Sequence, residues 1–236
     1  ITGLLIYGKS SGIQTQMEKA ASENVREMVK IIEASISEIR RNDIAAAQSL
    51  AAVFPTQGET DKVLSQLLEG SPFARLSFVP AGASAGISSD GNEFLPAELP
   101  QVKTTKPVTR VYMSNMGAWT YTIEKPVYQD DSLAGTLYAD VIMERYDHIL
   151  PNNIYQGEGL VYLLDSETLR FIYEPVSTNV FISGKYDLHG FLHDFGILDT
   201  ELEQNLSTAI ADRKSTIAKM WINDAYTYVY FWPVDE

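Results

Sequence analysis

The chain has 236 residues, enough for one large domain or for two domains of about 100 residues each. With 45% hydrophobic, 11% aromatic and 21% charged residues, its composition is that of a folded globular protein and excludes a disordered, fibrous or membrane-spanning chain. The formal net charge of −13 disfavours nucleic acids and anionic membrane surfaces as partners, because an acidic surface repels phosphate groups. The absence of cysteine excludes thiolate nucleophiles, disulfides, Cys-based zinc sites and iron–sulfur clusters.

The first residues, Ile1–Tyr7, form an apolar stretch. It is far shorter than the roughly 20 residues that cross a bilayer, and it lacks the basic region and the cleavage site of a signal peptide. We expect a short remnant, native or vector-derived, that follows a membrane helix outside this sequence.

A long helix is predicted next, because no Pro or Gly occurs between Ile13 and Phe54. Apolar residues recur there at spacings of three and four: Met17, Ala21, Val25, Met28, Ile32, Ile36 and Ile39. A helix of about 40 residues is about 60 Å long, so part of it must project or bridge two domains. The apolar stripe therefore has two interpretations, packing on its own domain or pairing with the same helix of a second chain. Pro55 ends this helix, and Thr60–Leu68 is predicted to form a second one.

After Gly70 the hydrophobic period changes to two, which predicts strands separated by turns. The runs are Phe73–Pro80, Ala83–Ser89, Val108–Ser114, Trp119–Tyr128 and Leu133–Met143. Their short connections favour an antiparallel sheet. The segment 91–108 is too long for a turn and contains three prolines, so we expect it to cover part of the sheet.

A short helix at Glu144–Leu150 leads to a second β series that opens at Gly159. Its predicted strands are 159–165, 169–176, 215–221 and 225–234, with a helix at 198–213 before the last two. The predicted fold class is α+β, with a long N-terminal helix followed by two antiparallel-sheet units in tandem. The predicted domains are a stalk helix 1–55, a first unit 56–150 and a second unit 151–236.

Three segments carry a resemblance to a known family. Lys125–Glu144 contains Pro-Val-Tyr, a turn, and then Gly-x-Leu-x-x-Asp-Val; Ile87–Gly91 is a turn after the second strand, and Gly159–Asp165 opens the second unit. In this order and spacing they resemble the double Cache sensor domains of bacterial receptors, over nearly the whole chain.

The resemblance implies two PAS-like units, a membrane-distal one (56–150) and a membrane-proximal one (151–236), outside the cytoplasm and between two membrane helices. It also implies that the distal unit binds a small molecule and passes a conformational change to a cytoplasmic histidine kinase, diguanylate cyclase or phosphodiesterase, or chemoreceptor. Contact with the membrane is then expected only through the flanking helices, and a homodimer through the N-terminal helix of the full-length receptor.

Candidate ligand contacts follow from the alternation of side chains along the predicted strands. If the polar faces converge under segment 91–108, they form a cavity with aromatic walls, a cation and an anion. Arg75 or Arg110 would bind a carboxylate and Asp140 an amine. The alternative is that the aromatic residues form sheet core and the charged ones surface ion pairs. The candidates are Arg75, Arg110, Tyr112, Ser114, Trp119, Tyr121, Tyr138 and Asp140.

The resemblance adds a role only for Asp140, which matches the acidic residue that amino-acid-binding members place against a ligand amine. The rest of that motif is not met, because no Arg-x-Trp precedes a Tyr-x-Asp and Tyr112-Met-Ser114 has Ser in place of the acid. The expected ligand is therefore a carboxylate, an amine or an amino-acid-like molecule.

Recognisable motifs of hydrolases, nucleotide-binding proteins and metalloproteases do not occur in the sequence. His189 and His193 have the i, i+4 spacing of zinc ligands, but Gly190 between them weakens the helix that this site needs. We expect no metal, no cofactor and no enzymatic activity. The alternative function is an extracytoplasmic hydrolase or solute-binding protein on a PAS-like scaffold.

Overall fold

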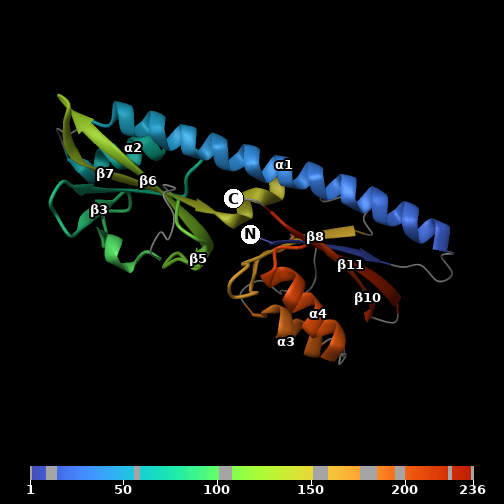
Figure 1. Cartoon of the computed structure of the whole chain (residues 1–236). Helices are drawn as coiled ribbons and strands as arrows, with labels where there is room; N and C mark the ends of the chain where they lie inside the picture. Colours follow the sequence, from blue (N-terminus) through green and yellow to red (C-terminus); the bar gives the residue numbers. More distant parts are fainter. Residues whose placement is uncertain are drawn as a thin grey trace. The chain divides into compact units, whose positions relative to one another are not determined.

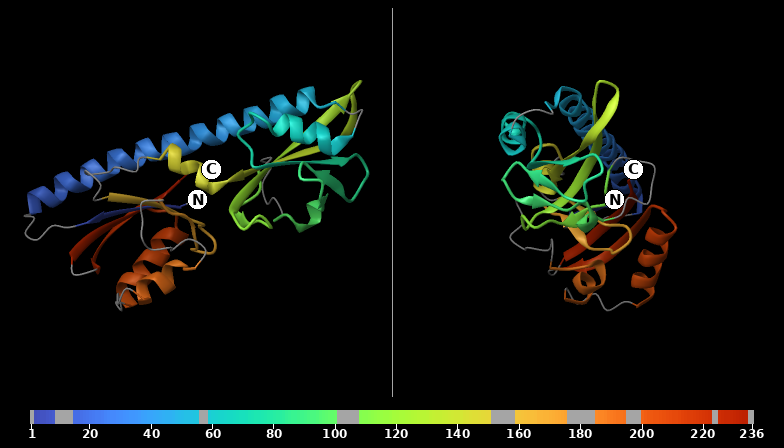
Figure 2. Two further views of the ribbon diagram at one scale, coloured as in Figure 1. Left: turned by 180° about the vertical axis from the view of Figure 1, so that it is seen from behind. Right: turned by 90° about the vertical axis from the view of Figure 1, so that its left-hand side faces the viewer.

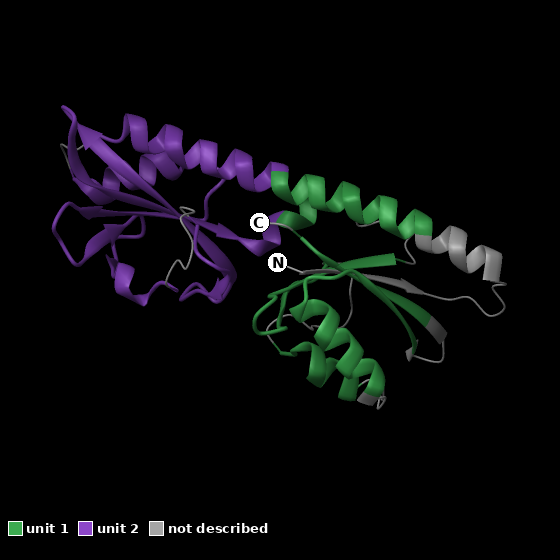
Figure 3. Ribbon diagram, viewed as in Figure 1, with its two compact units in different colours: residues 1–37, 146–236 green, residues 38–145 purple. Residues whose placement is uncertain are grey.

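The structure, a computed structural model, consists of two compact units (Figure 3). Unit 1 contains residues 1–37 and 146–236, and unit 2 contains residues 38–145. The described residues are 2–8, 15–55, 59–100, 108–150, 159–175, 185–194, 200–222 and 225–234. Their side chains are described from residue 23 onward, except at residues 200, 221, 222, 225 and 226.

Helix α1, Thr15–Val53, contributes residues to both units (Figure 1). The predicted stalk helix is thus shared between the units. Its buried positions keep a spacing of three or four residues: Val25, Val29, Ile32, Ile36, Ile39, Asp43, Ala47 and Ala51. Of the predicted stripe, Val25, Ile32, Ile36 and Ile39 are packed against their own chain and Met28 is half-buried, so this part favours the first interpretation; pairing with a second chain stays a prediction. The side chains of Met17 and Ala21 lie outside the described residues.

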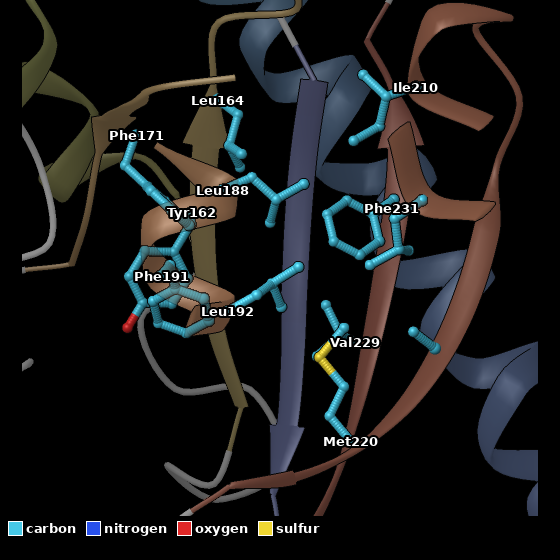
Figure 4. Packing of buried hydrophobic residues seen from close by; sticks show 12 residues of the cluster. Tyr162, Leu164, Phe171, Leu188, Phe191, Leu192, Ile210, Met220, Val229 and Phe231 are labelled. Carbon is cyan, nitrogen blue, oxygen red and sulfur yellow. The ribbon is translucent and has the colours of Figure 1, made fainter. Parts of the chain in front are cut away.

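Unit 1 is built on a five-stranded antiparallel sheet in the order β10-β11-β1-β8-β9. Helices α3 and α4 cover one face of this sheet, and the first part of α1 lies on the other (Figures 1 and 2). The core between the sheet and α3 and α4 includes Tyr162, Phe171, Phe191 and Phe231 (Figure 4). The elements are β1 (Thr2–Gly8), β8 (Gly159–Leu164), β9 (Phe171–Tyr173), α3 (Leu188–Asp194), α4 (Thr200–Ala211), β10 (Thr216–Ile222) and β11 (Ala225–Pro233).

Strand β1 differs from the expected N-terminal remnant, because Thr2–Gly8 pairs with β11 on one side and with β8 on the other. A segment that lies between two strands pairs its backbone N–H and C=O groups with both neighbours. An isolated extended segment has no such partners. A polar bond joins α1 to β11 in this unit, since Trp232 Nε1 donates to Glu33 Oε2 at 3.1 Å.

Unit 2 is built on a six-stranded antiparallel sheet in the order β4-β3-β2-β7-β6-β5. One face packs against the helices, where Phe54, just after α1, stacks on Phe78 of β2 and Leu64 of α2 is fully buried. Turns at Gly91 and Gly117 have positive φ, as hairpin turns require. The elements are α2 (Thr60–Leu68), β2 (Arg75–Pro80), β3 (Gly86–Ser88), β4 (Glu93–Phe94), η1 (Pro96–Glu98), β5 (Tyr112–Met113), β6 (Trp119–Gln129) and β7 (Ser132–Ile142).

The predicted helix after the fifth strand is the 3-10 helix η2, Met143–His148, which follows β7 directly. None of the described helices combines the length and the apolar character that a bilayer crossing needs.

Candidate ligand-binding site

The register of the unit 2 sheet places three polar residues directly opposite one another on adjacent strands. Arg75 of β2 pairs with Asp140 of β7, and Asp140 pairs with Thr122 of β6. Directly opposed residues lie on the same face of a sheet, so these side chains come together. This face is the one opposite to α1 and α2, and we call it the site face.

The Asp140 carboxylate, 2% exposed, accepts hydrogen bonds from two residues. Arg75 Nε donates to Oδ2 at 2.8 Å and Thr122 donates to Oδ1 at 2.6 Å, and Arg75 Nη2 lies 2.7 Å from Oδ2 in the same ion pair. Arg75 also donates through Nη1 to Asn115 Oδ1 at 2.8 Å. The charged pair is therefore buried with its geometry fixed from both sides, as a buried ion pair requires.

Tyr112 extends this polar network from β5. Its hydroxyl lies 2.8 Å from Thr122 Oγ1, and since the single Thr122 proton is given to Asp140, the phenol is the donor. Burial, together with the nearby Asp140 carboxylate, raises the pKa of Tyr112 to about 12. The phenol thus remains a hydrogen-bond donor at neutral pH.

Burial also raises the pKa of Asp140, and Arg75 and Thr122 oppose that shift by stabilising the charged form. The carboxyl is therefore sensitive to its partners, because desolvation is offset only while both donors stay in place.

An apolar cluster lies beside the polar network on the same face. Tyr138 of β7 and Val79 of β2 pack with Phe94 of β4, and Leu99 packs against them. The Phe94 and Tyr138 ring centroids are 4.9 Å apart. Phe94 and Leu99 both belong to the long segment after Gly91, so the described part of this segment covers the sheet as expected; residues 101–107 lie outside the described residues.

Four of the predicted residues do not join this arrangement. Tyr121 lies on the opposite face, where its hydroxyl donates to Asp43 of α1 at 2.7 Å, and alternation along β6 puts Trp119 on that face too. Ser114 bonds within its turn, to the Ala118 carbonyl and to Thr120, and Arg110 is exposed. The interpretation that all the polar and aromatic faces converge is wrong for Tyr121, because the residue next to Asp140 across the sheet is Thr122.

The sequence reasoning missed Thr122, Asn115 and the buried pair Ser77–Ser88, whose hydroxyl oxygens lie 2.9 Å apart on β2 and β3. The alternation that selected Asp140 could have found Thr122 if the register of β6 against β7 had been known. Asp43 was also missed, although a lone carboxylate that continues the apolar spacing of α1 is a signal readable from the sequence.

The two histidines with zinc-like spacing lie in α3 and point to separate partners. His189 pairs with Glu203, and His193 lies 3.4 Å from Asp194. Among the described residues, no group of three or more potential ligands could hold a metal ion.

The sequence matches no known family model and no curated protein. Solved structures nevertheless share its fold. The sensory domain of the Campylobacter jejuni chemoreceptor Tlp3 with isoleucine bound aligns with a TM-score of 0.56 and 15% identity, over 95% of this chain and 98% of that one. The extracellular domain of mmHK1S-Z2, described as a histidine kinase, aligns with a TM-score of 0.54 and 16% identity, over 91% and 97% of the two chains.

An extracellular ligand-binding receptor from Desulfohalobium retbaense DSM5692 also aligns, with a TM-score of 0.54 and 13% identity over 88% of this chain. This chain spans only 39% of that receptor's length. These likenesses confirm the predicted fold class, α+β with a long N-terminal helix and PAS-like antiparallel sheets.

Proposed function

We propose that this chain is an extracytoplasmic ligand-sensing domain of a transmembrane receptor and acts without catalysing a reaction. The proposal is supported by the fold, which is that of sensory domains of a chemoreceptor and of a protein described as a histidine kinase. One such domain, Tlp3, is known with isoleucine and with norvaline bound.

The observation that carries the proposal is the pairing of a buried polar network with an apolar cluster on one sheet face. Arg75, Thr122, Asp140 and Tyr112 supply directional hydrogen bonds. Tyr138, with Phe94 and Leu99 over it, supplies apolar surface. Small-molecule sites combine these two elements, a mostly apolar wall with a few fixed polar groups.

In this proposal the ligand is a small carboxylate, amine or amino-acid-like molecule that contacts the site face of unit 2. The output to which the domain reports is a histidine kinase, a diguanylate cyclase or phosphodiesterase, or a chemoreceptor. A homodimer of the receptor through the N-terminal helix would use positions other than Val25, Ile32, Ile36 and Ile39, since these four are buried in their own chain.

Thermal unfolding with a matched set of probes tests the function. Norvaline, valerate and butylamine share one alkyl chain and present an amino acid, a carboxylate alone and an amine alone. A site that binds one of them gains about 2.7 kcal/mol at a hundredfold excess over Kd, which raises the melting temperature by several degrees.

Asp140→Asn should abolish the shift, and Asp130→Asn, in an exposed turn, should leave it intact. The proposal fails if no probe in this set or among the other common amino acids shifts the wild-type protein. It also fails if a shift survives in a folded Asp140→Asn protein.

A further inference from the structure

Asp43 is a carboxylate in the middle of the buried stripe of α1, where the neighbouring positions Ile39 and Ala47 are apolar. It is 0% exposed, and both of its oxygens have partners in unit 2. Oδ2 accepts the Tyr121 hydroxyl at 2.7 Å, and Oδ1 accepts Arg145 Nη1. A buried carboxylate keeps this position only while such donors compensate its desolvation.

One donor comes from strand β6 and the other from the 3-10 helix that follows strand β7. Tyr121 is in β6 and is followed immediately by Thr122, which bonds Asp140. Arg145 is in η2, which follows β7, the strand of Asp140. Because consecutive side chains in a strand point to opposite faces, a backbone shift that moves Thr122 on one face moves Tyr121 on the other.

Two further contacts hold the donors in place. The Arg40 guanidinium, one turn before Asp43, lies over the Tyr121 ring at 5.3 Å from its centroid. Arg145 also donates to the Pro72 carbonyl at 3.4 Å, just before β2 and Arg75. One carboxylate of α1 is thus bonded to β6 and to the segment after β7, and its Arg145 partner also reaches the start of β2.

We propose that Asp43 is a positioning residue that couples the site face of unit 2 to helix α1. A change in the hydrogen bonds of Asp140 or Thr122 shifts β6 or β7, and α1 must follow, because otherwise the Asp43 carboxylate loses a donor in a water-free position. In the proposed sensor this coupling would pass the signal from the site face to α1, and that role rests on the proposed function. The coupling itself belongs to unit 2 and does not require a ligand.

Hydrogen exchange of the ligand-free chain tests the coupling. Thr122→Val removes the donor to Asp140 with little change of shape and touches no residue of α1 in the described contacts. We expect the amides of α1 around Asp43 to exchange at least tenfold faster than in the wild type. Ser77→Ala is the matched control, because it breaks a buried hydroxyl contact on the same face but lies in β2, and it should leave α1 unchanged.

The same change is then made in an Asp43→Asn background. We expect Thr122→Val to add nothing to the exchange rate of α1 there. If Asp43→Asn does not fold, Tyr121→Phe serves instead, because it removes one donor and keeps the ring under Arg40.

Equal effects of Thr122→Val with and without Asp43, no effect on α1, or an equal effect of Ser77→Ala would each overturn the proposal. Since no ligand is present, such a result leaves the proposed function standing. A failure of the ligand panel would, in turn, leave the coupling intact.

Discussion

Replacing Arg75 with Met removes the guanidinium from Asp140 and keeps an unbranched side chain of similar reach. The carboxyl, 2% exposed, is then left with Thr122 as its donor among the contacts described above. Breaking a buried ion pair by removing one partner destabilises a protein by about 3–5 kcal/mol, because the remaining charge is uncompensated. We expect a loss of that size for Arg75→Met at neutral pH.

The loss of stability in Arg75→Met should depend on pH, and its direction follows from the shift in the pKa of Asp140. Without Arg75 the pKa of Asp140, already raised by burial, rises further. A carboxyl whose pKa is higher in the folded than in the unfolded state favours folding below its unfolded pKa, and this contribution is lost as the pH rises through the folded pKa. The deficit of Arg75→Met relative to the wild type should therefore shrink on acidification from neutral pH towards the ordinary aspartate pKa of about 4.

Tryptophan fluorescence can follow unit 2 alone. Of the three tryptophans only Trp119 lies between residues 38 and 145, so a Trp221→Phe, Trp232→Phe background reports on this unit. Urea titrations of Arg75→Met, Asp140→Asn and the double variant then form a cycle. Because the double variant leaves no uncompensated charge, it should lose clearly less than the sum of the two single losses.

Lys62→Met provides the control, since Lys62 pairs with Glu59 in an exposed ion pair and its loss should not move the midpoint. If the double variant loses the sum of the single losses to within about 0.5 kcal/mol, Arg75 and Asp140 do not act as a pair and the reasoning fails.

For two other substitutions in unit 2, the structure predicts the direction of the change in stability. Gly135→Ala would place a Cβ 2.4 Å from the Val79 carbonyl oxygen and 2.5 Å from the Phe78 ring, so β2 and β7 must separate. The same fluorescence titration should show a marked loss of stability. An unchanged urea midpoint would contradict the close approach of the two strands. Burial raises the pKa of the Glu124 carboxyl. The wild type should therefore lose stability relative to Glu124→Gln as the pH rises from about 4 towards neutrality. Plots of the unfolding free energy against pH that run parallel for the two proteins would refute this shift.

The fold was predictable from the sequence because its signals are local. The absence of Pro and Gly before Phe54 predicted α1, and alternation with turn glycines predicted β2, β6 and β7 close to their observed bounds. The strand predicted at 83–89 is shorter in the structure, Gly86–Ser88. Short connections predicted the antiparallel sheet. Arg75 and Asp140 were both selected as site residues, and they meet because their strands are neighbours.

The arrangement of the site depended on register and orientation, which are not local. Alternation shows that Tyr121 and Thr122 point to opposite faces, but only the packing of α1 determines which face is which. Tyr121 was selected because an aromatic phenol suits a ligand wall, and it suits a helix contact equally well. Strand β1 was missed for a similar reason, since its partners β8 and β11 are more than 150 residues away along the chain.

The geometry of Asp140 also bears on which class of ligand the site face can hold. The resemblance places a ligand amine at this carboxylate, but in this chain Arg75 lies directly opposite it in the sheet and already neutralises it. An ammonium group would have to compete with an intramolecular guanidinium that is already hydrogen-bonded and ion-paired to the carboxylate, and displacing Arg75 would leave that cation buried without its partner. Of the three matched probes, butylamine therefore meets the greatest obstacle at Asp140, because its ammonium group is its only polar group.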